Sequence, residues 1–236
     1  MNIFPNIKGG EVRWDALVFG HLFANRYFGE SGDRPPRGAP STCSSVLIRG
    51  RQADGKDYCL IVDPTIRHSD KEYYYDLNRH SGLHPEAITH CFSTHEHFDH
   101  WNGLKYFPDA QWLTAKGNKA FIGKANEGAV NRETGDNLSP TIPWERIEEV
   151  SGEFLPGVYA LHLPGHTAIL HGIAFVSEGK KILVAADAVM TREHFKDRVT
   201  EFSPSDELKK KAAETIDNIR ESFDIVVPGH DNLIVI

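Results

Sequence analysis

The sequence predicts an α+β protein in which β-sheets are covered by helices. Short runs rich in apolar and β-branched residues alternate with segments of helical spacing along the chain. Some neighbouring runs are joined by tight turns and others by helices, which is typical of sheets packed against helices. No internal repeat and no shift in composition divides the sequence. We therefore expect residues 1–236 to form a single domain.

The first predicted elements follow residue 43. Two β-rich runs, 44–49 and 57–62, flank Ala53-Asp54-Gly55-Lys56, which is a hairpin turn sequence. A helix is expected over 69–80, because Ser69 can cap its start and Ser81-Gly82 can end it.

The remaining elements alternate between strands and helices. Residues 205–222 form the clearest amphipathic helix, with apolar residues such as Leu208 and Ile216 on one face and lysines opposite. Residues 177–180 are expected to form a tight turn between two strands. Strands are predicted over 88–93, 158–163, 171–176, 181–186 and 223–227, and a further helix over 115–125.

The first 42 residues are expected to hold an N-terminal strand and an aromatic, Pro- and Gly-rich loop. Residues 29–42 and 127–143 both read as long loops. The aromatic residues near the N-terminus could form a lid over a site, pack in the core or make a dimer contact. These residues are Trp14, Phe19, Phe23, Tyr27 and Phe28.

Composition and charge exclude several classes of partner. The net charge is −7 and the pI about 6, so we expect no nucleic-acid partner. No apolar stretch reaches the roughly 20 residues needed to span a bilayer, and we expect no signal peptide, because residues 1–8 lack a basic segment followed by an apolar one. The three cysteines, Cys43, Cys59 and Cys91, are widely spaced and are expected to be reduced core thiols of a cytoplasmic protein. A thiol ligand or nucleophile is the alternative.

The segment from His95 to His100 constrains function most tightly. It reads His-Glu-His-Phe-Asp-His and follows the predicted strand 88–93 directly. Alternate side chains of an extended chain lie on one side, so His95, His97 and Asp99 can converge. Imidazole nitrogens and carboxylate oxygens are ligands that zinc and related divalent ions prefer. The alternative is a polar loop that happens to be rich in histidine.

Further side chains of this type stand at the ends of other predicted strands. Pro-Gly precedes both His166 and His230, which supplies a rigid turn and a permissive backbone at a strand end. Asp63 closes the run 57–62 and is expected at the same edge. Four predicted strands that could point the same way therefore end in a ligand type: His95, His166, Asp187 and His230.

These motifs resemble those of the metallo-β-lactamase fold superfamily of hydrolases. The markers, in order, are Val62-Asp63-Pro64, His95 to His100, Gly165-His166-Thr167, Asp187 and Gly229-His230. The ligand spacing is most similar to that of the lactonase and glyoxalase II-like branches. The resemblance implies an αββα sandwich, with two mixed β-sheets face to face, helices on the outside and a metal site on one edge.

The resemblance also implies a binuclear centre. His95, His97 and His166 would hold the first ion, and Asp99, His100 and His230 the second. Asp187 would bridge the two, while Asp63 and Thr167 would orient ligands. Zinc is the first choice for both divalent ions, with iron or manganese as alternatives.

Such a centre can hydrolyse a small-molecule substrate. Two ions about 3.5–4 Å apart can share a hydroxide, which would attack an ester, thioester, lactone, amide or phosphoester. Asp99 is the candidate catalytic proton carrier, with pure ligation as its alternative. The competing functions are a mononuclear iron oxygenase acting on a persulfide, which would use His95, His166 and Asp187, a phosphodiesterase, and a non-catalytic binding module.

Candidates for the substrate pocket are Trp101, His171 and Met190. Trp101 could wall the site or pack beneath the metal loop, and His171 could be a structural histidine. In the quorum-signal lactonases that this ligand spacing resembles, a substrate-contacting tyrosine follows the bridging aspartate closely, and the corresponding stretch here, Ala188-Val189-Met190, has no tyrosine. Lactonase activity is therefore open, and the oligomeric state is open too, with a homodimer as one alternative.

Overall fold

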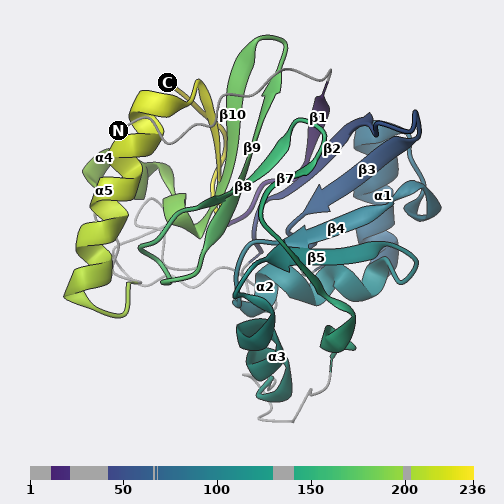
Figure 1. The fold of residues 1–236 in the computed structure, drawn as a ribbon, viewed down its shortest axis with the longest axis horizontal. Helices are drawn as coiled ribbons and strands as arrows, with labels where there is room; N and C mark the ends of the chain where they lie inside the picture. The colour runs from purple at the N-terminus through teal and green to yellow at the C-terminus, as the bar shows by residue number, and fades with distance from the viewer. Residues whose placement is uncertain (1–11, 22–41, 66, 68, 130–140, 199–202) are drawn as a thin grey trace.

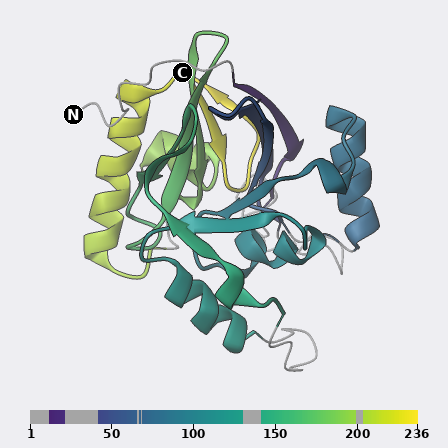
Figure 2. The same ribbon diagram turned by 45° about the vertical axis from the view of Figure 1, so that its right-hand side comes forward.

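Two six-stranded mixed sheets lie face to face at the centre of the fold, and helices cover their outer faces (Figure 1). The computed structural model describes residues 12–21, 42–65, 67, 69–129, 141–198 and 203–236. Figure 2 shows α5 (Asp206–Ser222, yellow) and α1 (Asp70–Ser81, blue) on opposite sides of the paired sheets. The predicted αββα sandwich is confirmed.

The first sheet has the strand order β1-β2-β3-β4-β5-β6. Its first three strands are antiparallel, and β3 to β6 are parallel. Parallel neighbours end at the same edge of a sheet, which brings the residues after β3 and β4 together. The strands are β1 (Arg13–Val18), β2 (Ser45–Arg51), β3 (Asp57–Val62), β4 (His90–Ser93), β5 (Gln111–Ala115) and β6 (Glu148–Val150).

The second sheet has the order β12-β11-β10-β9-β8-β7. β10 pairs with β11 in parallel, and β9 pairs antiparallel with both β8 and β10. Strands β8, β10 and β11 therefore run in one direction, as predicted from their sequences. The strands are β7 (Gly152–Leu155), β8 (Val158–His162), β9 (His171–Ser177), β10 (Lys180–Ala186), β11 (Ile225–Pro228) and β12 (Ile234–Val235).

The helices begin and end where the sequence provides caps. Ser69 accepts a hydrogen bond from the Glu72 amide at the start of α1, and Gly82 (φ 71°) ends that helix. Ser205 caps α5 in the same way. The other helices are α2 (Phe98–Trp101), α3 (Lys119–Glu127) and α4 (Arg192–Asp197), with short 3₁₀ turns at Pro85–Ala87, Asn102–Tyr106, Trp144–Arg146 and Asp187–Val189.

Alternation along the strands creates three apolar layers. On β2, Val46 and Ile48 point between the sheets, whereas Leu47 points outward beneath the helices. The outer layers are completed by α1, α2 and α3 on the first sheet and by α5 on the second. Both faces of these strands are buried, which explains why they read as continuous apolar runs.

Several boundaries differ from the prediction. The expected helix 115–125 is wrong at its start, because Ala115 is the last residue of β5 and Gly117 (φ 95°) turns the chain before Lys119. The strand predicted over 88–93 begins only at His90, after a 3₁₀ turn. β11 is shifted to Ile225–Pro228 relative to the predicted 223–227.

The N-terminal strand is present as β1, where Trp14 packs edge-on against Phe175 in the layer between the sheets. Most of the loop 29–42 and residues 130–140 of the loop 127–143 lie outside the described residues, as do Phe23, Tyr27 and Phe28. Cys43, Cys59 and Cys91 are all free thiols. Among the described residues, every helix is too short or too polar to span a lipid bilayer.

Candidate metal centre

The predicted ligands meet because their strands end at one edge of the sandwich. His95 follows β4, His166 follows β8, Asp187 follows β10 and His230 follows β11. Left-handed backbone conformations turn the chain at this edge, at Asp63 (φ 49°) and at Ala186 (φ 48°). Non-glycine residues rarely adopt such angles, and where they do the backbone strain often marks a functional site.

The glycines before two of the histidines permit close approach. A Cβ atom on Gly229 would lie 2.1 Å from Asp187 Oδ1, and one on Gly165 would lie 2.5 Å from the Cα of Ala212. Gly165 also has φ 149°. The Pro-Gly-His sequences thus place a histidine on a backbone that only glycine allows to pack this tightly.

One group of donor atoms consists of His95, His97, His166 and Asp187, all within 4.8 Å of one another. His166 Nε2 lies 2.8 Å from His97 Nδ1 and 3.2 Å from Asp187 Oδ2. His95 Nε2 lies 3.8 Å from the same carboxylate oxygen. His97 is exposed, whereas the other three side chains are buried. The first group is therefore open to solvent at His97.

A second group forms around the other oxygen of Asp187. His100 Nε2 lies 3.3 Å and His230 Nε2 3.2 Å from Asp187 Oδ1. Asp99 Oδ2 lies 3.5 Å from His230 Nε2 and 3.8 Å from His100 Nε2. The two oxygens of Asp187 thus face different sets of histidines, which is the arrangement expected of a bridging carboxylate.

Hydrogen bonds fix the rings of the second group. Asp63 Oδ1 accepts the Thr94 amide, and Asp63 Oδ2 accepts the Thr94 hydroxyl and lies 2.8 Å from His100 Nδ1. His230 Nδ1 lies 3.0 Å from the carbonyl oxygen of Thr42. A histidine whose Nδ1 donates outward presents Nε2 as the free acceptor toward the site.

Thr167, the other predicted orienting residue, is buried, and its hydroxyl has no hydrogen-bond partner among the described residues. Its role stays a prediction.

The ionised carboxylate of Asp187 lies among the histidines of both groups and affects their pKa values. Burial would raise the pKa of Asp187, but His230, His100 and His166 outweigh it and hold this pKa well below its usual value. Burial lowers the pKa of His166 to about 4 and that of His95 well below its usual value. An ionised carboxylate therefore faces two neutral imidazoles, His95 and His166, whose lone pairs are available to a cation. Burial opposes it, but nearby acidic groups raise the pKa of His100 and of His230, so these two rings would release a proton on binding a cation.

The donor set fits metal ions. His95 Nε2, His100 Nε2 and Asp187 Oδ1 are buried and make no hydrogen bond among the described residues. Two donors on one tetrahedral zinc ion lie about 3.4 Å apart, given bonds of about 2.0–2.1 Å. The nitrogen–oxygen distances to Asp187 span 3.2 to 3.8 Å, which matches that value. A divalent ion in each group would satisfy these unpaired atoms.

Cys43, which the sequence predicts to be a core thiol, lies beside the second ligand group. Its Sγ, a carboxylate oxygen of Asp99 and a ring nitrogen of His100 all lie within 4.8 Å of one another. Cys43 stands just before β2, outside every recognised motif, so no local signal in the sequence points to this position. Only the pairing of distant segments reveals it.

The three pocket candidates are not members of these groups. Trp101 is fully buried in the layer beneath the first sheet, and its Nε1 donates to the carbonyl of Glu96, which favours the packing alternative. His171 is half-buried and its ring lies beside that of His162. Met190 is buried, and its carbonyl accepts the His230 amide. Contact of these residues with a substrate stays a prediction.

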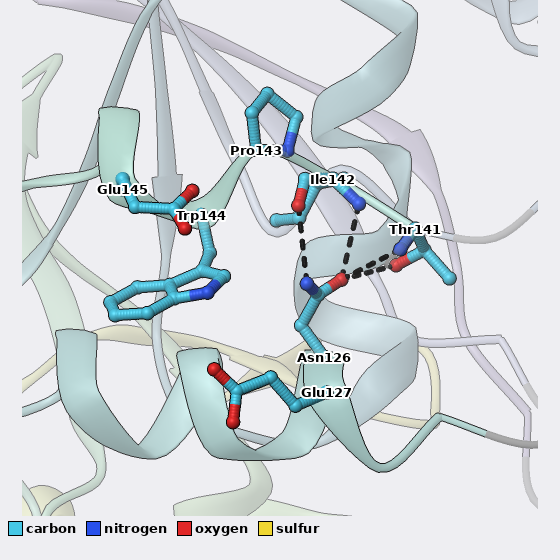
Figure 3. Close-up of a pocket in the computed structure, with 7 residues that line it drawn as sticks. All are labelled: Asn126, Glu127, Thr141, Ile142, Pro143, Trp144 and Glu145. Atoms are coloured by element: carbon cyan, nitrogen blue, oxygen red, sulfur yellow. Dashed lines mark hydrogen bonds between the residues drawn. The ribbon is translucent and has the colours of Figure 1, made fainter. Parts of the chain in front are cut away.

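A separate pocket lies between the end of α3 and residues 141–145 (Figure 3). The side-chain oxygen of Asn126 accepts hydrogen bonds from Thr141 and from the Ile142 amide, and its Nδ2 donates to the Ile142 carbonyl. The pocket contains none of the predicted ligands, so it is distinct from the candidate metal centre.

Comparisons with known proteins agree with this geometry. Residues 38–230 match the model of the metallo-beta-lactamase superfamily. N-acyl homoserine lactonase AiiA of Bacillus thuringiensis subsp. kurstaki is 24% identical over 167 residues, which cover 69% of this chain and 64% of that protein. An N-acyl homoserine lactonase of Bacillus cereus is 27% identical over 189 residues, covering 78% of this chain and 70% of that protein.

Solved structures share the fold. A candidate metallo-beta-lactamase from Thermotoga maritima superposes with a TM-score of 0.69 at 19% identity, covering 96% of this chain and all of that one. A quorum-quenching N-acyl homoserine lactone lactonase superposes with a TM-score of 0.62 at 20% identity, covering 94% and 92%. The family model, which matches most of the sequence, shows that the chain belongs to the metallo-beta-lactamase superfamily of hydrolases.

Proposed function

We propose that this protein is a metal-dependent hydrolase that uses two divalent ions to cleave an ester, thioester, lactone or related bond in a small molecule. The observation that carries the proposal is that the two carboxylate oxygens of Asp187 face different histidines. Its Oδ2 faces His95 and His166, and its Oδ1 faces His100 and His230. A carboxylate shared in this way can hold two ions side by side. Zinc is the first choice, because neutral imidazole and carboxylate are its usual ligands.

Bound divalent ions would supply a nucleophile at neutral pH, by lowering the pKa of water to about 7, and would polarise the bond to be cleaved. The chain contributes the positions of its groups. Burial keeps His95 and His166 neutral, so that they remain ligands rather than cations. Asp63 and the Thr42 carbonyl hold His100 and His230 in place.

Asp99 is our candidate for the proton carrier. Its side chain is 20% exposed, whereas those of Asp187, His100 and His230 are at most 3% exposed. One oxygen of Asp99 faces His230 and His100, and the partly exposed carboxylate is placed to exchange protons with solvent. A carboxylate so placed could take a proton from the attacking water and pass it to the leaving group.

Lactones head the list of substrates to test, because the curated relatives above are N-acyl homoserine lactonases. The match spans 64% of the length of the first of them. The stretch after Asp187, Ala188-Val189-Met190, lacks the tyrosine expected for quorum-signal lactonases. Esters and thioesters therefore belong beside lactones in the panel.

We also propose a single catalytic domain acting in the cytoplasm on a small molecule, without nucleic acid or membrane as partner. The free thiols of Cys43, Cys59 and Cys91 and the net charge of −7 support this setting.

The test is elemental analysis of the purified protein followed by a hydrolysis panel of esters, thioesters, lactones and phosphodiesters. We expect about two divalent ions per chain, activity on at least one carbonyl substrate, loss of activity with a chelator and recovery with zinc. One iron per chain with oxygen uptake on a persulfide would replace this proposal with the oxygenase. Full metal loading with cleavage of phosphodiesters alone would replace it with a phosphodiesterase.

A further inference from the structure

Residues Thr42 and Cys43 lie against the second ligand group. The Thr42 carbonyl is 3.0 Å from His230 Nδ1 and orients that ring. The thiol of the next residue lies within 4.8 Å of both a His100 ring nitrogen and an Asp99 carboxylate oxygen. Two successive residues therefore lie beside three of the side chains that the proposed second ion would use.

The position of Cys43 is fixed by both sheets. Its amide donates to the Thr65 hydroxyl at 2.9 Å, and the Ser44 amide donates to the Gly229 carbonyl at 2.6 Å. The side chain is fully buried, and its thiol contacts the Asp99 carbonyl oxygen at 3.1 Å. Because hydrogen bonds hold the backbone on either side of Cys43, the sulfur can change direction only by rotation about the Cα–Cβ bond.

The Cys43 thiol has backbone partners in the carbonyl oxygens of Asp99 and Asp63, but one nitrogen of the neighbouring His100 ring has no partner among the described residues. His100 Nε2 is buried and makes no hydrogen bond among the described residues, while Nδ1 of the same ring is engaged by Asp63. A sulfur, a carboxylate oxygen and an imidazole nitrogen are together a donor set suited to zinc, cobalt or cadmium.

We propose that Cys43 is a thiolate ligand of the second metal ion, in addition to Asp99, His100 and His230. This inference rests on the binuclear site of the proposed function. Binding forms a metal–sulfur bond and breaks the S–H bond, whose proton goes to solvent, so that no oxidant or reductant is required. In the metal-free protein burial raises the pKa of Cys43 to about 12, and the group remains a neutral thiol.

The consequence is a second site with a softer donor set than histidine and aspartate alone provide. Thiolate ligands favour zinc, cobalt and cadmium over magnesium and manganese. We therefore expect Cys43→Ser to lower the affinity for the second zinc ion by about 10-fold or more, since even residues that only orient a ligand contribute about that much to metal affinity.

The experiment is a titration of the metal-free full chain with Co²⁺, followed by absorbance. Cobalt–thiolate bonds give an intense charge-transfer band in the near ultraviolet, whereas nitrogen and oxygen ligands give only weak visible bands. We expect the intense band to appear with the second equivalent of Co²⁺, to vanish in Cys43→Ser and to persist in Cys91→Ser. Cys91 is the matched control, because it is equally buried but lies on β4 outside the ligand groups.

The outcomes separate the two proposals. Two bound Co²⁺ ions with visible bands and no charge-transfer band would overturn the role of Cys43 and leave the hydrolase centre intact. A band that survives Cys43→Ser would overturn it as well. Failure to bind Co²⁺ at all would overturn both proposals. If Cys43→Ser does not fold, ¹¹³Cd NMR of the wild-type protein decides, because a thiolate ligand shifts the resonance downfield and its absence contradicts the inference.

Discussion

His100 Nδ1 lies 2.8 Å from Asp63 Oδ2, and both side chains are completely buried. The same carboxylate accepts the amide and the hydroxyl of Thr94, so three hydrogen bonds hold Asp63 in place. The imidazole donates its Nδ1 proton to this anchored acceptor and thereby directs Nε2 at Asp187 Oδ1, 3.3 Å away. Asp63 thus sets the direction of a ligand without belonging to either ligand group.

Asp63→Asn is expected to weaken binding of the second metal ion by about 10- to 100-fold. An amide offers one accepting oxygen, and its NH₂ group would face the Thr94 amide or the His100 ring as a second donor. Competition with a chromophoric chelator measures the affinity. Asp57→Asn, at the exposed first residue of the strand that Asp63 follows, should leave the affinity for the second ion unchanged. Equal affinities for all three proteins would refute the orienting role of Asp63.

His97→Ala is expected to abolish hydrolysis and lower the metal content while the chain stays folded. His97 is exposed, so its removal leaves no cavity in the core, but it takes a donor from the first group. We expect kcat/KM to fall by more than about 100-fold, since orienting residues alone contribute up to that factor. Elemental analysis, circular dichroism and the hydrolysis assay check this, with exposed His84→Ala as the control. Full activity in His97→Ala would contradict the assignment of the first group.

Gly229→Ala is expected to damage the centre through Asp187. The added Cβ would lie 2.1 Å from Asp187 Oδ1 and 2.9 Å from the carbonyl carbon of Ala186, so the carboxylate must move. Overpacking of this kind costs about 1–3 kcal/mol of stability. Urea unfolding and metal content are the measurements. Gly128→Ala, where the new Cβ would meet only the Lys124 carbonyl at 3.5 Å, should be neutral, and a neutral Gly229→Ala would show that the approach to Asp187 is unimportant.

His194→Asn is expected to make the protein less sensitive to acid. Burial lowers the pKa of His194 to about 4, against the opposing effect of Asp187, from an ordinary value of 6.5. Between about pH 6.5 and about pH 4 the unfolded chain binds a proton that the folded chain does not, so the free energy of unfolding falls as the pH falls.

At 1.36 kcal/mol for each unit, His194 accounts for about 3 kcal/mol of that loss. Asn can still accept the Met190 amide, which now donates to His194 Nδ1 at 3.1 Å. Urea unfolding near neutral pH and at about pH 4 measures how much free energy of unfolding each protein loses on acidification. The control His84→Asn, which changes an exposed histidine, should lose as much free energy of unfolding as the wild type. A loss of the same size in His194→Asn would contradict the prediction.

The sequence by itself determined the order of the strands that carry ligands and the residue that follows each one. These are local properties: an apolar run predicts a strand, and Pro-Gly-His or His-x-His after it places a donor at the strand end. His95, His166, Asp187 and His230 could therefore be predicted to converge, once their strands were expected to run in one direction. Capped helices such as α1 and α5 could be predicted for the same reason.

The tertiary structure decided everything that depends on how distant strands pair. Which oxygen of Asp187 faces which histidines follows from the register of β10 against β11 and the packing of one sheet on the other. Cys43 reaches His100 only because the start of β2 lies beside α2, the short helix that follows β4, and no pattern near either residue indicates that approach. Local sequence fixes which donors reach the edge, and long-range packing sets the distances that make them a metal centre.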